Sequence, residues 1–143
     1  MENLLISACL VGYNVKYNGK NNYKSFIEEL KKKYNLILIC PESAGGLTIP
    51  RVPSEIKDGK VYSKTGLDVT SNFDLGAKKV LEKCIRFNCK KALLKESSPS
   101  CGVNKVYDGN FSDTKIPGIG VCAKLLKEHG IELYTENDID KLL

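Results

Sequence analysis

Three of the six cysteines, Cys9, Cys40 and Cys101, stand where residues of a shared chemical site are expected. Cys9 and Cys40 each end a short apolar run, and Cys101 lies in the turn-rich stretch SSPSCG after a third apolar run. In an open parallel sheet the loops that follow the strands lie side by side at the carboxyl edge, where ligands bind. The three thiols are therefore predicted to meet at one edge of a sheet.

Three thiolates favour a soft metal, either zinc or an iron–sulfur cluster, over hard cations such as Mg²⁺. The C-x₂-C pairs of structural zinc sites and the cysteine spacing of ferredoxins are both absent, so local motifs leave the metal open. Three ligands where four are usual leave one coordination position for a substrate. This arrangement favours catalysis over electron transfer or structural support.

The other three cysteines have a different setting. Cys84 and Cys122 occupy apolar stripes at helical spacing, which is typical of small core residues. Cys84 and Cys89 are five residues apart, so on a continuous helix their side chains would point about 140° away from each other. We do not expect them to act together.

The elements that position these cysteines alternate between strands and helices. Short apolar runs predict strands, and apolar residues at helical spacing predict helices, one of them with a capping-box pattern at Ser71-x-x-Asp74. The expected strands are residues 4–9, 36–40, 92–95 and 131–134, and the expected helices are 23–35, 71–85, 119–129 and a last short one. Asp58-Gly59 in the long loop between them predicts a small hairpin. The pattern predicts an α/β fold, a single three-layer Rossmann-like domain over residues 1–143, with a mostly parallel sheet of about four to five strands.

Composition and charge place the chain among globular proteins of the cytoplasm. Hydrophobic residues make up 42% and charged residues 27%, and no apolar run approaches the roughly 20 residues of a membrane span. The first residues lack the basic segment of a signal peptide and carry Glu2 instead, so the thiols are expected to stay reduced. The net charge is +5, but the lysines fall mostly on helix faces without interleaved aromatic residues. A nucleic acid partner is neither excluded nor supported.

Four blocks of sequence resemble the thiouracil desulfidase (TudS) family. They are SACLVG, CPESAGGLTIPRVPSEI, GLDVTSNFDLGA and LLKESSPSCGVNKVYDGNF, and they follow in order over nearly the whole chain. The resemblance implies a [4Fe-4S] cluster held by Cys9, Cys40 and Cys101, with the fourth iron free to take the sulfur of a thiolated pyrimidine. It also implies an enzyme, a desulfidase that converts thiouracil to uracil plus sulfide without a redox step.

Beside the cysteines, several polar residues are candidates for catalysis and substrate binding. Glu42, two residues after Cys40, is the first candidate for the proton acceptor that hydrolysis requires. Ser98 and Ser100 are placed to donate hydrogen bonds to the cluster sulfurs or to the substrate, and we expect Ser100 to act in catalysis and Ser98 in binding. Ser-Pro-Ser is equally common in turns.

Two further residues are expected to contact substrate. Arg51 has two interpretations, because in PRVPSE it either orients the substrate or forms a structural ion pair with Glu55. Asp68, in GLDVT, either binds substrate or starts the following helix.

Alternative functions remain open at this stage. The same three cysteines suit a non-catalytic module that carries zinc or persulfide, and a redox enzyme that depends on an electron donor. The segment Gly118-x-Gly120-x-x-Ala123 matches a dinucleotide-binding fingerprint, but no convincing strand precedes it, so we expect a helix start whose free N–H groups face an anion. No motif indicates which molecule accepts the sulfide.

Overall fold

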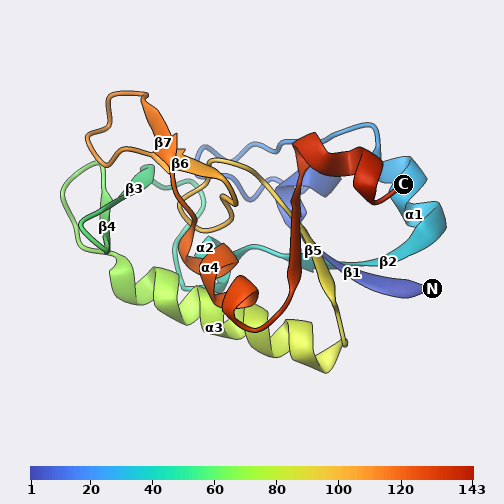
Figure 1. Ribbon diagram of the computed structural model, residues 1–143. Coiled ribbons are helices and arrows are strands. Elements are labelled where there is room, and N and C mark those ends of the chain that lie inside the picture. Colours follow the sequence, from blue (N-terminus) through green and yellow to red (C-terminus); the bar gives the residue numbers. More distant parts are fainter.

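A computed structural model describes residues 1–143, and its centre is a four-stranded parallel sheet (Figure 1). The strand order is β2-β1-β5-β8, and each neighbouring pair is parallel. The strands are β1 (Glu2–Ser7), β2 (Tyr34–Ile39), β5 (Lys91–Leu94) and β8 (Glu132–Thr135). The predicted α/β class and the parallel sheet are confirmed.

The sheet is buried on both faces, which explains why its strands read as unbroken apolar runs. Leu5 and Leu94 pack into one hydrophobic cluster, while Leu4, Ile6 and Leu93 pack into another on the opposite face. Side chains of successive strand residues point to opposite faces, so a run without polar residues fills two cores at once.

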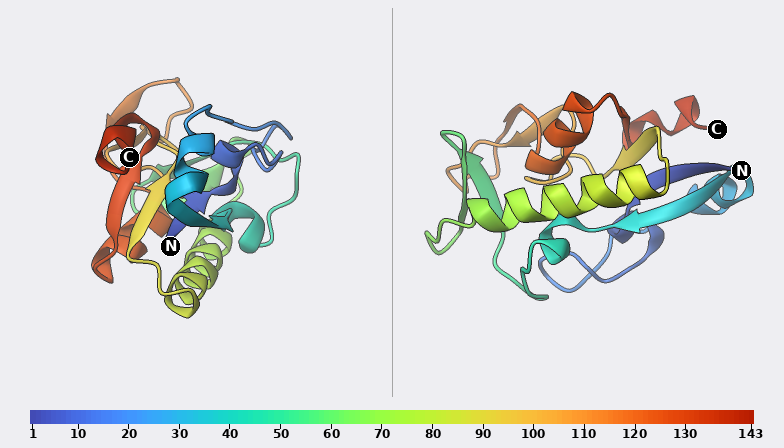
Figure 2. Two further views of the ribbon diagram at one scale, coloured as in Figure 1. Left: turned by 90° about the vertical axis from the view of Figure 1, so that its right-hand side faces the viewer. Right: turned by 90° about the horizontal axis from the view of Figure 1, so that it is seen from below.

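Helices cover both faces and give three layers (Figure 2). On one face α3 (Thr70–Arg86) packs against α4 (Val121–Glu128) and against the short α2 (Pro41–Ala44). On the other face lie α1 (Ile27–Lys33) and the 3₁₀ helices η1 (Ala8–Val11) and η2 (Glu136–Lys141). None of the helices combines the length and the apolar character needed to cross a membrane.

Two antiparallel hairpins extend beyond the carboxyl edge of the sheet (Figure 1). The first pairs β3 (Ser54–Lys57) with β4 (Lys60–Ser63), and the predicted turn residues Asp58 and Gly59 both have positive φ, at 51° and 77°. The second pairs β6 (Lys105–Tyr107) with β7 (Lys115–Pro117) and was not predicted. Its strands have three residues each, too few for an alternating pattern to be recognised.

Helix boundaries and one cysteine pair differ from the prediction. Helix α3 begins at Thr70 without a side-chain cap, so the expected capping box at Ser71 and Asp74 does not form. The same helix ends at Arg86, after which the chain turns back and the Cys84 thiol donates to the Cys89 carbonyl at 3.4 Å. The assumption of one continuous helix from Cys84 to Cys89 is therefore wrong, while the expectation that the two cysteines do not act together stays a prediction.

Candidate active site

A pocket of about 430 Å³ opens at the carboxyl edge of the sheet, and Cys9, Cys40 and Cys101 all line it. Cys9 lies in η1 directly after β1, Cys40 is the N-cap residue of α2 directly after β2, and Cys101 lies in the loop after β5. Three segments far apart in the sequence thus bring one thiol each to the same cavity. The prediction that these thiols meet at one sheet edge is confirmed, while their role as metal ligands stays a prediction.

The thiols differ in what surrounds them. Cys101 is buried, and burial raises the pKa of its thiol to about 12, although Ser7 donates a hydrogen bond to its Sγ at 3.3 Å. Burial also raises the pKa of Cys9, whose Sγ accepts a hydrogen bond from Asn22 Nδ2 at 3.3 Å. Both cysteines are neutral near pH 7 in the metal-free protein, so metal binding must release protons.

The three thiols are ligands of the kind that hold an iron–sulfur cluster. Nowhere in the protein do three His, Cys, Asp or Glu side chains converge closely enough to hold one metal ion. In a zinc site all thiolates lie about 2.3 Å from the same ion, whereas in a [4Fe-4S] cluster each thiolate binds a different iron, so the sulfurs lie farther apart.

Glu42 lies in the same pocket, within a buried ion pair. Arg51 Nε is 3.2 Å from Glu42 Oε1, and the two side chains are only 8% and 16% exposed. Arg51 also donates to the carbonyl oxygens of Thr48 and Val15, at 3.1 and 2.9 Å. The guanidinium therefore fixes the carboxylate against two loops.

The structure corrects the expected pairing of Arg51 with Glu55. Glu55 is buried, lines the pocket, and accepts hydrogen bonds from the backbone N–H groups of Gly109 and Phe111, at 2.9 and 3.2 Å. Glu55 therefore ties the two hairpins together. The ion pair of Arg51 goes to Glu42 instead, because the turn of α2 brings Glu42 closer.

Ser98 and Ser100 also line the pocket and order the loop that carries Cys101. Ser98 Oγ accepts hydrogen bonds from the N–H groups of Ser100 and Cys101, at 3.1 and 3.0 Å. Ser100 Oγ lies 2.9 Å from Ser98 Oγ and donates to Glu42 Oε2 at 3.1 Å. A chain of two hydroxyl groups thus ends at the Glu42 carboxylate.

The first residues of α4 donate backbone hydrogen bonds to the loop that carries Cys101. Val121 N–H donates to the Pro99 carbonyl, and the N–H groups of Cys122 and Ala123 donate to the Ser100 carbonyl. A Cβ atom on Gly120 would lie 2.6 Å from the carbonyl carbon and oxygen of Ser100, so only glycine allows this contact. The expectation that these N–H groups are free to face an anion is wrong, because the loop uses them.

Comparison with known proteins decides the family. A family model described as 2-thiouracil desulfurase matches residues 4–138. The chain belongs to this family. It is therefore a member of an enzyme family, in agreement with the resemblance found in the sequence.

Two relatives agree with this assignment. The chain is 38% identical to a solved structure titled [4Fe-4S]-dependent thiouracil desulfidase TudS, with a TM-score of 0.94 over 99% of this chain and 95% of that chain. It is also 37% identical to a Bacillus subtilis (strain 168) protein named uncharacterized protein YbbK, over 98% of this chain and 99% of that protein.

In this desulfurase family member, Asp68 is the one predicted site residue that does not line the pocket. Asp68 is exposed, and its Oδ1 accepts hydrogen bonds from the N–H and the hydroxyl of Thr70, at 2.9 and 2.6 Å. It thereby orders the start of α3. The structure offers no support for a substrate contact by Asp68.

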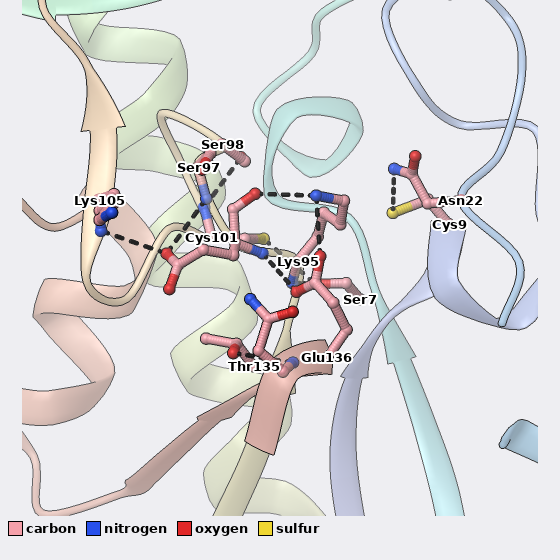
Figure 3. A network of polar contacts seen from close by, with 12 residues as sticks. Ser7, Cys9, Asn22, Lys95, Ser97, Ser98, Cys101, Lys105, Thr135 and Glu136 are labelled. Atoms are coloured by element: carbon pink, nitrogen blue, oxygen red, sulfur yellow. Dashed lines mark hydrogen bonds and ion pairs between the residues drawn. The ribbon is translucent and has the colours of Figure 1, made fainter. Parts of the chain in front are cut away.

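Several residues that support the site were missed by sequence reasoning. Ser7 and Asn22 contact cysteine sulfurs, and Glu136 forms an ion pair at 2.9 Å with Lys95, a lysine at the end of the third predicted strand that the sequence indicates as a candidate counter-charge to the cluster (Figure 3). The carboxylate of Glu96 accepts hydrogen bonds from the N–H groups of Ser97, Val103, Asn104 and Lys105. Their partners lie far away in sequence or are backbone groups, so no local motif indicates them, although Ser7 belongs to the block SACLVG.

Proposed function

We propose that this protein is an iron–sulfur-dependent desulfidase that hydrolyses a thiolated pyrimidine, thiouracil being the reference substrate, to the oxygen analogue and sulfide. In this proposal Cys9, Cys40 and Cys101 hold a [4Fe-4S] cluster. The observation that carries the proposal is the meeting of these thiols, from three strand ends, in one pocket with Glu42 and Ser100. The family and the 38% identity to a [4Fe-4S]-dependent thiouracil desulfidase support it.

The three cysteines fit the cluster by the chemistry of their donors and by their number. A [4Fe-4S] cluster usually has four cysteine ligands. Held by three, it supplies one iron without a protein ligand, which is a Lewis acid for a soft thiocarbonyl sulfur.

Glu42 is the proposed proton acceptor. Hydrolysis of a thiocarbonyl consumes one water: a C–O bond forms, the C–S bond breaks, and two protons leave the water oxygen, so that C=S plus H₂O gives C=O plus H₂S. Arg51 holds Oε1 of Glu42 at 3.2 Å, and its other oxygen lies against Ser100. A carboxylate fixed in this way can take a proton from water and return it to the departing sulfide.

Ser100 and Ser98 are proposed to position the water and the substrate. The Ser100 hydroxyl donates to Glu42 and lies 2.9 Å from the Ser98 hydroxyl, so one of its lone pairs remains to accept a hydrogen bond from the pocket side. The Ser98 oxygen already accepts two backbone N–H groups and fixes the loop in which Ser100 stands. Arg51 is proposed to act through Glu42 and to line the substrate pocket.

The test is anaerobic reconstitution with iron and sulfide, followed by incubation with 2-thiouracil and no electron donor. We expect broad visible absorption, and release of uracil and sulfide in equal amounts, with ¹⁸O from labelled water in the uracil. Serine variants of Cys9, Cys40 or Cys101 should each lose the absorption, while Cys89→Ser, outside the pocket, should keep it. Full cluster content in Cys101→Ser, or turnover that requires a reductant, would contradict the proposal.

A further inference from the structure

Two of the three pocket cysteines have a side-chain hydrogen-bond donor at their sulfur, and the third does not. Ser7 Oγ lies 3.3 Å from Cys101 Sγ, and Asn22 Nδ2 lies 3.3 Å from Cys9 Sγ (Figure 3). The contact at Cys40 is of the opposite kind, since its Sγ faces the Val15 carbonyl oxygen at 3.9 Å. An oxygen acceptor gives no stabilisation to a thiolate.

The Ser7 oxygen is held in place by a second contact. The Lys95 backbone N–H donates to Ser7 Oγ at 3.0 Å, and the Ser7 hydroxyl proton is left to donate to Cys101 Sγ at 3.3 Å. Ser7 is the last residue of β1, is 3% exposed, and stands between two strands of the sheet. The donor is therefore held rigidly by the sheet.

Asn22 is fixed at two points on the same cysteine. Its backbone N–H donates to the Cys9 carbonyl at 2.9 Å, and its side-chain amide donates to the Cys9 sulfur at 3.3 Å. The residue comes from the loop between η1 and α1, which otherwise has mostly exposed side chains. This loop returns to the pocket at Asn22.

We propose that Ser7 and Asn22 are positioning residues that stabilise the Cys101 and Cys9 thiolates by hydrogen bonds and raise the reduction potential of a cluster bound there. This inference rests on the proposed function, because it assumes the cluster. Hydrogen bonds to ligand sulfurs and local charge set the potential of such clusters, since they stabilise the added electron. Cys40, without a donor, is then the most electron-rich of the three ligands.

The test is a dye-mediated potentiometric titration of the reconstituted protein, followed by visible absorption and by the electron paramagnetic resonance signal of the reduced cluster. Ser7→Ala and Asn22→Ala should each move the midpoint potential to more negative values. Asn22→Asp should move it further, because it replaces a donor with a negative charge. Both substitutions at Asn22 leave the backbone contact to Cys9 intact, so they report on the donor even where Ser7→Ala folds poorly.

Two control variants match these changes. Asn21→Ala removes an exposed side-chain amide from the same loop. This amide forms hydrogen bonds with Asn14 and Tyr23 and has no contact with a cysteine sulfur. Ser43→Ala removes a buried hydroxyl, three residues after Cys40, that has no hydrogen-bond partner. Neither should move the potential.

The outcomes separate this inference from the function on which it rests. A lower potential in the Ser7 and Asn22 variants, with the control variants unmoved, supports the inference. A wild-type protein that binds a cluster, together with variants of unchanged potential, overturns the inference alone. A wild-type protein that gains no cluster absorption overturns the proposed function itself.

Discussion

Replacement of Arg51 by alanine tests whether the buried ion pair with Glu42 determines the stability of the site. The Arg51 and Glu42 side chains are 8% and 16% exposed, so Arg51→Ala leaves a largely buried carboxylate without its cationic partner. Breaking a buried pair from one side typically costs about 3–5 kcal/mol. At roughly 2–4 °C of melting temperature per kcal/mol for a chain of this length, the expected loss is on the order of 10 °C.

A surface ion pair of similar geometry provides the comparison. Lys32 Nζ lies 3.4 Å from Glu29 Oε1, but these side chains are 74% and 61% exposed. Exposed pairs contribute about 0.2–1 kcal/mol, so Lys32→Ala should lie within about 1 kcal/mol of the wild type. The ion-pair distances are alike, so the two predictions differ through burial and through the two carbonyl contacts that Arg51 makes in addition.

The assay is urea-induced unfolding of the iron-free protein under reducing conditions. Free energies of unfolding are compared between variants whose m-values, the slopes against urea concentration, are equal. The double variant Arg51→Met with Glu42→Met should recover much of the loss, because no unpaired charge stays buried. If Arg51→Ala costs no more than Lys32→Ala, solvent reaches Glu42 in solution and the reasoning about a buried pair fails.

Three further predictions concern the cysteine loop. Gly120→Ala should reduce cluster content, because its Cβ must displace the backbone of Ser100. Gly130→Ala strains its own turn, where φ is 81°, but its Cβ meets no atom within 4 Å, so it should keep the cluster, and equal iron contents in the two variants would contradict the prediction. Burial opposes ionisation of Glu96, but hydrogen bonds led by those from Asn104 lower its pKa below the usual 4.5. Glu96→Gln should therefore lower the free energy of unfolding by its full amount at pH 7, and this loss should shrink as the pH falls from about 4.5 through the folded pKa. Urea unfolding at several pH values measures the loss, and a loss that does not change with pH would refute the prediction. In the iron-free protein, burial raises the pKa of Cys101 from 9.0 to about 12. Iodoacetamide at pH 8 should therefore label Cys101 roughly 1000-fold more slowly than an ordinary thiol, because only the thiolate reacts. Mass spectrometry measures the labelling rate, and an ordinary rate at Cys101 would show that its thiol is not buried in solution.

The sequence predicts the parts of the site that depend on local pattern. Apolar runs locate the strands, and the topology of a parallel sheet then places Cys9, Cys40 and Cys101 at one edge without any pairing information. Glu42 is found for the same reason, since it follows Cys40 by two residues. These predictions rest on burial and chain direction, which short stretches of sequence encode.

Partners and close approaches are harder to predict, because they depend on how elements pack. Arg51 pairs with Glu42 and not with Glu55 because α2 and the following loop fold over each other. Asn22 reaches Cys9 only through the path of a polar loop without regular structure. The assumption of one continuous helix from Cys84 to Cys89 failed because α3 ends at Arg86, and the position of a helix end depends on packing.

The anchoring of the Cys101 loop by α4 has a consequence for when the site forms during synthesis. The ribosome releases all three cysteines before it releases Val121 and Ala123, whose segment fixes the loop carbonyls. Glu136, which holds Lys95 at the pocket wall, emerges later still. The loop therefore lacks these contacts in the nascent chain, and the proposed cluster is expected to be loaded onto a completed fold. Maturation of this protein is accordingly expected to be a post-translational step.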